Sequence, residues 1–308
     1  MPWIRKGLIY RPREAGGRGG SHAQVPTVLV CGDRLRIYYA DRDPDGKSYT
    51  TYIDVSRSDP ARVLYEHREP ILPRGAPGTF DDDGMMPSCC VRKPDSLWLY
   101  YSGWNRGVTV PYRNSVGIAV STDGGGTFSR LYEGPVLDRT PAEPYIAVTP
   151  TILIEDGLWR MWYISGSRWV PIDGRLEPVY HIKYADSSDG ISWRRPNHLC
   201  IVPRHELEAY SHPTVLKMGG IYHMWFCSRN SIDFRDGAGS YRIGYARSED
   251  GLNWSRDDAA HGLPAAAAGW DSSMTCYPFV TAFDDRVHLF YNGNGFGRSG
   301  IGYAQLEL

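Results

Sequence analysis

Apolar and polar residues alternate along this chain in short runs that are bounded by glycine and proline. Residues 35–39, Leu-Arg-Ile-Tyr-Tyr, are typical, since they combine alternation with β-branched and aromatic side chains. A period of two residues predicts strands with one buried face. No segment keeps the 3.6-residue apolar period of an amphipathic helix. We therefore predict an all-β fold.

The strand pattern repeats along the whole chain. A proline that opens a small or β-branched run recurs at intervals of 61, 63, 63 and 65 residues, at Pro26, Pro87, Pro150, Pro213 and Pro278. An aromatic-rich second strand follows each proline, at residues 36–40, 97–102, 160–165, 223–228 and 288–292, and a third strand follows that. A repeat of this kind indicates the blades of a β-propeller. We predict one domain, residues 1–308, with five blades that open near these prolines and hold four antiparallel strands each.

The last repeat reaches the carboxyl end of the sequence after its third strand. Residues 3–10 form a strand-like segment that belongs to no repeat. An amino-terminal strand that completes the last blade would close the ring by hydrogen bonds and leave no free sheet edge there. We therefore expect residues 3–10 to supply the missing fourth strand and the two ends of the chain to be neighbours.

Three tight turns of the form Ser-x-Asp-Gly separate third and fourth strands, at residues 121–124, 187–190 and 248–251, and each is followed by Phe128, Trp193 or Trp254. The aspartate accepts backbone hydrogen bonds in such a turn, and the glycine supplies a positive φ. These turns resemble the Asp-box of sialidases. We expect them to have a structural role and assign no chemistry to them.

Composition narrows the class of ligand. The 34 Lys and Arg nearly balance the 35 Asp and Glu, and no basic stripe is present, so nucleic acid is not an expected partner. No apolar run approaches the roughly 18 residues of a membrane span, and the amino terminus has no signal-peptide pattern. The six cysteines have no zinc-ligand spacing, so we expect no metal and no other cofactor. A soluble, cytoplasmic protein is predicted.

In a propeller, the loops that enter the first strands and those that leave the second strands meet on one face, around the central channel. Here these loops are rich in carboxylates, amides, arginines and flat aromatic rings. Such groups bind sugar hydroxyls, while Trp and Tyr stack on the C–H faces of a sugar. We expect a small carbohydrate or sugar derivative to be bound by His22, Gln24, Arg42, Asp43, Asp81, Trp104, Asn105, Arg168, Trp169, Tyr210, Arg229, Asp271, Tyr277, Asn292 and Asn294.

Three arginines, Arg106, Arg168 and Arg229, follow second strands in successive repeats. Guanidinium groups bind phosphate and carboxylate in a bidentate manner. Convergence of two or three of them would favour a sugar phosphate, a nucleotide sugar or an acidic sugar.

The chain resembles the five-bladed glycoside-hydrolase-like propellers, the group with the invertase, levansucrase, arabinanase, β-xylosidase and mannoside phosphorylase folds. The resemblance covers essentially the whole chain. It rests on the repeated aromatic second strand, on the hairpins that join a Gly-containing third strand to the Ser-x-Asp-Gly turns, and on residues 78–84 and 269–272. It implies a glycosidase-like, carbohydrate-active protein. Hydrolases of this group act through two carboxylates in the pocket.

The resemblance also implies an acidic residue directly before the proline of the first strand, but these positions hold Val25, Met86, Thr149, His212 and Tyr277. Acidic residues lie four to seven positions upstream instead, and we expect them in the mouth of the pocket. The candidate catalytic residues are Asp83, Glu143, Glu208 and His212. A carboxyl group among them can be a general acid or base if its pKa is raised toward neutrality. His212 can be a general base or a metal ligand.

Two other functions remain open at this point. Without the usual carboxylates, the chain can be a sugar-binding, sugar-phosphate-binding or biosynthetic propeller that hydrolyses nothing. A purely structural or protein-binding propeller predicts no polar cluster in the channel, and the polar loops described above argue against it.

Overall fold

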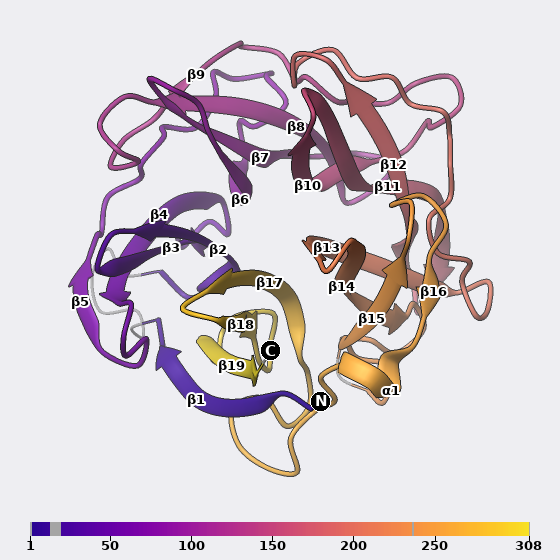
Figure 1. The fold of residues 1–308 in the computed structure, drawn as a ribbon. Coiled ribbons are helices and arrows are strands. Elements are labelled where there is room, and N and C mark those ends of the chain that lie inside the picture. The colour runs from indigo at the N-terminus through magenta and orange to yellow at the C-terminus, as the bar shows by residue number, and fades with distance from the viewer. Residues whose placement is uncertain (1, 13–19, 236, 308) are drawn as a thin grey trace.

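The regular secondary structure is almost entirely β in the computed structural model, which describes residues 2–12, 20–235 and 237–307 (Figure 1). Within these ranges there is one short helix, α1 (Asp258–His261). The strands are arranged radially, and the strands that follow each long loop, β2, β6, β10, β13 and β17, lie innermost (Figure 1). Each of these contacts the next around a closed ring. The all-β prediction is confirmed.

Hydrogen bonds divide the strands into sheets. The largest contains β2 (Gln24–Cys31), β3 (Arg34–Arg42), β4 (Ser48–Ser56), β6 (Gly84–Arg92), β7 (Leu97–Arg106), β8 (Tyr112–Ser121) and β9 (Ser129–Arg130), with β5 (Val63–Glu66) paired to β4. The pairing of β4 with β6 is a single parallel pair, Ser48 with Gly84. The halves on either side of this pair therefore behave as separate sheets.

The remaining sheets follow in chain order. One contains β10 (Ala147–Glu155), β11 (Leu158–Ile172) and β12 (Arg175–Ser187), and the next contains β13 (Glu208–Met218), β14 (Ile221–Asn230), β15 (Arg242–Ser248) and β16 (Ser255–Arg256). The last contains β17 (Cys276–Phe283), β18 (Arg286–Asn292), β19 (Ile301–Glu307) and β1 (Ile4–Tyr10).

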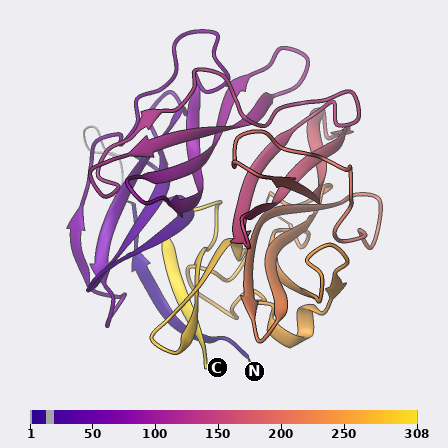
Figure 2. The ribbon, with the colours of Figure 1, turned by 45° about the horizontal axis from the view of Figure 1, so that its top comes forward.

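The two ends of the chain close the ring. Strand β1 pairs antiparallel with β19, from Ile4 opposite Gln305 to Tyr10 opposite Ile301, and the two strands lie side by side in Figure 1 and Figure 2. The expectation that an amino-terminal strand completes the last sheet is confirmed. Because β19 has partners on both sides, its edge is not free to pair with another chain.

The hydrophobic core lies between neighbouring sheets. Trp162 of β11 packs in one cluster with Met224 of β14, and Tyr100 of β7 packs in another with Met161 of β11. These side chains are fully buried. The aromatic second strands thus supply the core, because their alternate side chains face the adjacent sheet on either side.

The Ser-x-Asp-Gly turns join adjacent sheets. Hydroxyls of Tyr38 and Tyr100 donate to the carbonyls of Gly125 and Gly190, both at 2.7 Å, and Trp162 Nε1 donates to Gly251 at 2.8 Å. Each donor lies on a second strand, and each acceptor lies in the turn of the following sheet. These contacts support the structural role expected for the turns.

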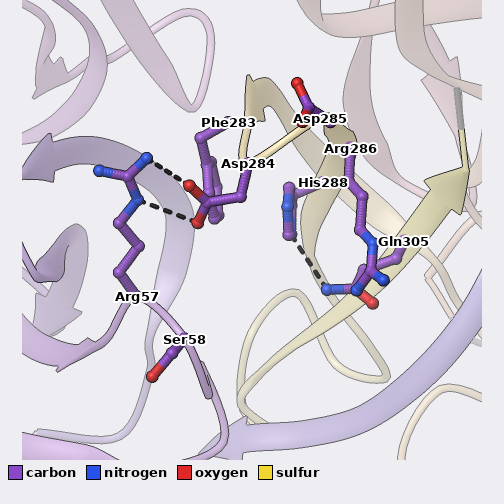
Figure 3. A pocket seen from close by; sticks show the side chains of 8 residues that line it. All are labelled: Arg57, Ser58, Phe283, Asp284, Asp285, Arg286, His288 and Gln305. Carbon is purple, nitrogen blue, oxygen red and sulfur yellow. Dashed lines mark hydrogen bonds and ion pairs between the residues drawn. The ribbon is translucent and has the colours of Figure 1, made fainter.

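The joint between the last and the first sheet differs. Phe290 stands where three of the other second strands carry a donor to the next turn, and it has none to offer. An ion pair between Arg57 and Asp284, at 2.5 Å, spans this joint beside a surface cavity of about 470 Å³ (Figure 3). His288 and Gln305 line the same cavity. An exposed ion pair therefore replaces the buried hydrogen bond found at other joints.

Candidate functional site

Every innermost strand is interrupted near its proline. Pairing with the second strand shifts register between Gln24 and Thr27, Pro87 and Cys89, Val148 and Thr151, Ser211 and Thr214, and Cys276 and Phe279. Proline has no N–H for the ladder, so a bulge at this position is expected. The prolines thus lie inside the strands rather than at their first residues.

The residue before the proline is strained in four of these strands. Val25, Thr149, His212 and Tyr277 have φ values of 52°, 47°, 50° and 52°. This left-handed region is costly for residues with a side chain, and a following proline disfavours it further. Strain of this kind gathers at functional sites, where surrounding contacts hold it in place.

Neighbouring sheets hold three of the strained residues. The backbone N–H of Val25 donates to Asn292 Oδ1 at 2.9 Å, that of Thr149 to Ser102 Oγ at 3.0 Å, and that of Tyr277 to Cys227 Sγ at 2.8 Å. Each acceptor lies at the same point of the preceding second strand. Three inner strands are therefore tied to the preceding sheet at the strained residue.

His212 and Thr149 carry polar atoms that lack hydrogen bonds among the described residues. His212 is 2% exposed, and neither of its ring nitrogens has a hydrogen-bond partner. The hydroxyl of Thr149 is also buried and also lacks a hydrogen-bond partner. Burial lowers the pKa of His212 to about 4, so the ring is neutral at pH 7. A buried polar group without a partner costs about 1–3 kcal/mol. Both groups therefore have hydrogen-bonding capacity that no described residue uses.

Tyrosines gather beside His212. The ring of Tyr277 meets that of His212 edge-on at 6.0 Å and that of Tyr241 at 5.9 Å, and the hydroxyls of Tyr241 and Tyr180 are 2.5 Å apart. Tyr180 comes from the long β11–β12 hairpin. Burial raises the pKa of Tyr277 well above its usual value, so the phenol stays protonated. The site offers aromatic faces and neutral hydroxyls.

Two arginines approach the site from the first and last sheets. Arg42 Nε donates to Gln24 Oε1 at 2.8 Å, and Arg298 Nε donates to His22 Nε2 at 3.3 Å. Because guanidinium can only donate, His22 Nε2 accepts, and its proton lies on Nδ1, 2.6 Å from Ser21 Oγ. Burial, then the charges of Arg42 and Arg298, lower the pKa of His22 to about 4. His22 is therefore a neutral donor to Ser21.

Most of the acidic candidates are buried in ion pairs. Four carboxylates each accept a tyrosine hydroxyl and bind an arginine near the outer edge of the same sheet: Asp81 with Tyr101 and Arg130, Glu143 with Tyr163 and Arg195, Glu208 with Tyr210 and Arg256, and Asp271 with Tyr291 and Arg5. These carboxylate residues are 0–5% exposed. The structure thus places them inside the sheets rather than in an open mouth.

Glu143 and Glu208 do not have the raised pKa that a general acid needs near neutral pH. Burial acts to raise the pKa of Glu143, but the hydrogen bond and charge of Arg195 and the charge of Lys183 outweigh it, so the pKa is lowered. Arg256 has the same effect on Glu208. Asp83 accepts the Arg106 N–H and pairs with Lys47, and its pKa is lowered too. All three are anionic at neutral pH.

Asp41 is the carboxylate that the sequence analysis did not select. It is 7% exposed and accepts the N–H groups of His22 at 3.1 Å and Arg42 at 2.7 Å, and the Tyr49 hydroxyl at 3.1 Å. Burial raises the pKa of Asp41 although these hydrogen bonds act to lower it. Its position directly before Arg42, a residue already selected, is the signal that was available.

Other candidates have local roles. Asp43 pairs with Arg74, Trp104 Nε1 donates to Ser48 Oγ, Asn105 donates to the Thr79 carbonyl, and Asn294 accepts the N–H groups of Ser273 and Met274. Asn292 uses its side chain on Val25, Ala23 and Gly300, and Trp169 packs on Tyr112.

The three arginines after second strands do not meet on a shared group. Arg106 donates to the Asp45 carbonyl, and Arg168 to that of Glu206. Arg229 is 3% exposed and donates to Tyr241 and to the Pro178 carbonyl. The arginines that lie close to one another are instead those beside His22.

Among the described residues, no group of three or more His, Cys, Asp and Glu side chains is placed to hold a metal ion. Within the same ranges, no helix is long and apolar enough to cross a membrane.

Comparison with known proteins identifies one full-length relative in Mycobacterium tuberculosis strain H37Rv, the uncharacterised protein Rv1502. It is 36% identical over 311 aligned residues, which cover 100% of both chains. No family model matches.

Solved structures show the fold. The structure of a BT0996 RGII complex has a TM-score of 0.77 at 20% identity, and the match covers 99% of this chain and 92% of the BT0996 chain. A structure from the GH130 family, described as mannoside phosphorylases that also include glycoside hydrolases acting on β-1,2 mannosidic linkages in Candida mannan, has a TM-score of 0.69 at 15% identity and covers 99% and 93%. The fold is that of the glycoside-hydrolase propellers.

Proposed function

The chain belongs to the same family as Rv1502, and from this premise we propose that it is a glycosidase-like, carbohydrate-active protein with a sugar site at the axial end of its inner strands. We further propose a single domain of five blades, which is supported by division of the largest sheet at the single Ser48–Gly84 pair. The glycoside-hydrolase fold of its structural neighbours supports this class of function. Fold alone does not fix the chemistry.

The observation that carries the proposal is the pair of unsatisfied polar side chains on strained inner-strand positions, His212 and Thr149. Sugar hydroxyls both donate and accept, so they can complete these groups. The adjacent ring of Tyr277 offers a face for sugar C–H groups. A ligand that binds here recovers the cost of burying polar atoms without partners.

For glycoside cleavage, we propose Asp41 as the proton donor and His212 as the proton acceptor. Burial raises the pKa of Asp41, the direction that a proton donor needs, and His212 is neutral at pH 7 with ring nitrogens that bind no described residue. This set differs from the two-carboxylate arrangement of the resembled hydrolases.

A second candidate, sugar binding without hydrolysis, is favoured by one observation. Glu143 and Glu208, the buried acids among the original candidates, are held as anions in ion pairs with arginine. Neither can donate a proton to a leaving group in that state.

Ligand binding is tested by thermal denaturation with neutral mono- and oligosaccharides at millimolar concentration, since a ligand raises stability by mass action. We expect at least one sugar to raise Tm in the wild type and in His223→Phe, a change on the second strand β14 outside the proposed site, but not in His212→Phe. An absence of any shift across the panel would contradict the proposed site.

Hydrolysis is tested with a panel of aryl glycosides. If the chain cleaves glycosides, Asp41→Asn should lower kcat at least 100-fold, while Asp45→Asn, an exposed residue of the same loop, should not. An inactive wild type that still binds sugar would support the second candidate.

A further inference from the structure

The buried arginines of this chain fall into two groups. Arg130, Arg195 and Arg256 lie within 3.0 Å of a buried carboxylate. Arg229 and Arg42, near the proposed sugar site, bind only neutral acceptors among the residues that the structure describes. A partly buried cation without an anion is costly, so its retention points to an anionic ligand.

Arg42 is held at the edge of the inner strand β2. Its Nε donates to Gln24 Oε1 at 2.8 Å, its NH1 group donates to the Gly46 carbonyl at 2.9 Å, and its guanidinium lies 5.7 Å from the Trp104 ring. These contacts fix the side chain and add no negative charge. The guanidinium is therefore oriented before any ligand binds, which lowers the entropy cost of binding.

Arg298 reaches the same edge from the loop between β18 and β19. The Ala23 N–H donates to the Gly297 carbonyl at 3.0 Å, and Arg298 Nε contacts His22 Nε2 at 3.3 Å. Gly297 has a φ of 97°, and a Cβ there would lie 3.0 Å from Gln24 Cγ, so glycine permits this close approach. The loop thus brings a second guanidinium next to His22, two residues before Gln24.

No nearby carboxylate among the described residues neutralises this pair. Asp41 uses its oxygens on the backbone of His22 and Arg42 and on the Tyr49 hydroxyl. Burial lowers the pKa of Arg42, the proximity of Tyr277 opposes this, and the charge of Arg298 lowers it further. The two cations therefore repel each other until an anion binds between them.

We infer that the sugar derivative bound at this site carries an oxyanion, a phosphate monoester or a carboxylate, which binds between Arg42 and Arg298. This inference rests on the proposed function and specifies its substrate class. Guanidinium groups donate paired hydrogen bonds that match phosphate and carboxylate oxygens. The sugar ring would then extend from β2 toward Tyr277 and His212, with the anion at the joint between the last and first sheets.

Isothermal titration calorimetry of the full chain tests the inference with matched probes: hexoses, their 1- and 6-phosphates, and the corresponding uronates. A charge-assisted hydrogen bond contributes about 1.5–3 kcal/mol, so we expect an anionic ligand to bind roughly 10–100-fold more tightly than its neutral parent. Preference for phosphates or for uronates identifies which oxyanion is bound.

The variants Arg42→Gln and Arg298→Gln should each reduce this preference about tenfold, and Arg298→Gln should leave the affinity for the neutral sugar unchanged. Arg298 is exposed, so its substitution should not affect folding. Arg139→Gln, at an exposed arginine paired with Asp138, is the matched control and should keep the preference. Equal affinity for neutral and anionic sugars, or a preference that survives both variants, would overturn the inference while the sugar site stands. If no sugar of either kind binds, the proposed function fails as well.

Discussion

Two sets of buried polar side chains differ: four acids are paired inside the sheets, whereas two inner-strand residues that precede prolines, His212 and Thr149, have unpaired polar atoms. Inside the sheets, every one of the acids Asp81, Glu143, Glu208 and Asp271 has both a tyrosine hydroxyl and an arginine. On the inner strands, His212 and Thr149 are buried with polar atoms unpaired. The same fold satisfies the first set repeatedly, so the second set is not explained by a lack of suitable partners. The first set stabilises the blades, and the second is placed for a ligand.

The largest expected effect comes from breaking an ion pair inside a sheet. Arg195→Met should lower the free energy of unfolding by about 3–5 kcal/mol, because Glu143 would keep its charge in a buried site. Lys183, 3.6 Å from Glu143, should place the loss at the lower end of this range. Guanidinium chloride denaturation measures it.

An ion pair that is exposed on both sides supplies the control. The side chains of Arg139 and Asp138 are 44% and 42% exposed, so Arg139→Met should leave the denaturation midpoint close to that of the wild type. Equal losses in the two variants would remove the distinction between buried and exposed pairs on which the comparison depends.

The buried ion pair of Glu143 with Arg195 also predicts a pH dependence of stability. In the wild type the pKa of Glu143 is lowered from its usual 4.5, so the pair stabilises the fold above pH 4.5 and this stability is lost as the pH falls through the lower folded-state value. In Arg195→Met, burial without that guanidinium should raise the pKa of Glu143 above 4.5. The deficit of the variant should then grow as the pH rises from 4 to 7, by about 1.4 kcal/mol per pKa unit. A deficit that is constant over this range in denaturation experiments would contradict the assignment.

The repeat spacing and the amino-terminal strand were predictable from sequence because each depends on local pattern. The pairing of acid with arginine was not, since it joins residues 49, 52 and 48 positions apart, as in Asp81 with Arg130, Glu143 with Arg195 and Glu208 with Arg256. A search for an arginine at this nearly constant sequence separation after each acid would have found these three pairs. The environment of Asp41 could not be predicted, because its oxygens bind backbone N–H groups whose direction depends on the fold.

A neutral, fully paired group should give a smaller effect than the ion pair. Tyr100→Phe removes the hydroxyl that donates to the Gly190 carbonyl at 2.7 Å between adjacent sheets, and leaves that carbonyl without its donor. We expect a loss of about 1 kcal/mol in thermal or chemical denaturation. Tyr65→Phe, on a half-exposed side chain that contacts His67, should have almost no effect. If both variants matched the wild type, the turns would not join the sheets energetically.

The smallest change in stability, and the one of opposite sign, is expected on the inner strands. His212→Phe removes two ring nitrogens that are buried without hydrogen bonds, so it should not destabilise the ligand-free protein and should stabilise it by up to about 1 kcal/mol. The larger phenyl ring limits the gain, because a tightly packed site resists extra volume. Thr149→Val isolates the polar term, since valine has nearly the same shape and adds no backbone strain to a residue that is already β-branched. Denaturation without ligand measures both variants. If Thr149→Val lowers the free energy of unfolding by more than about 1 kcal/mol, its hydroxyl stabilises the folded chain. Thr149 would then resemble the paired acids inside the sheets, and the contrast between the two sets would fail.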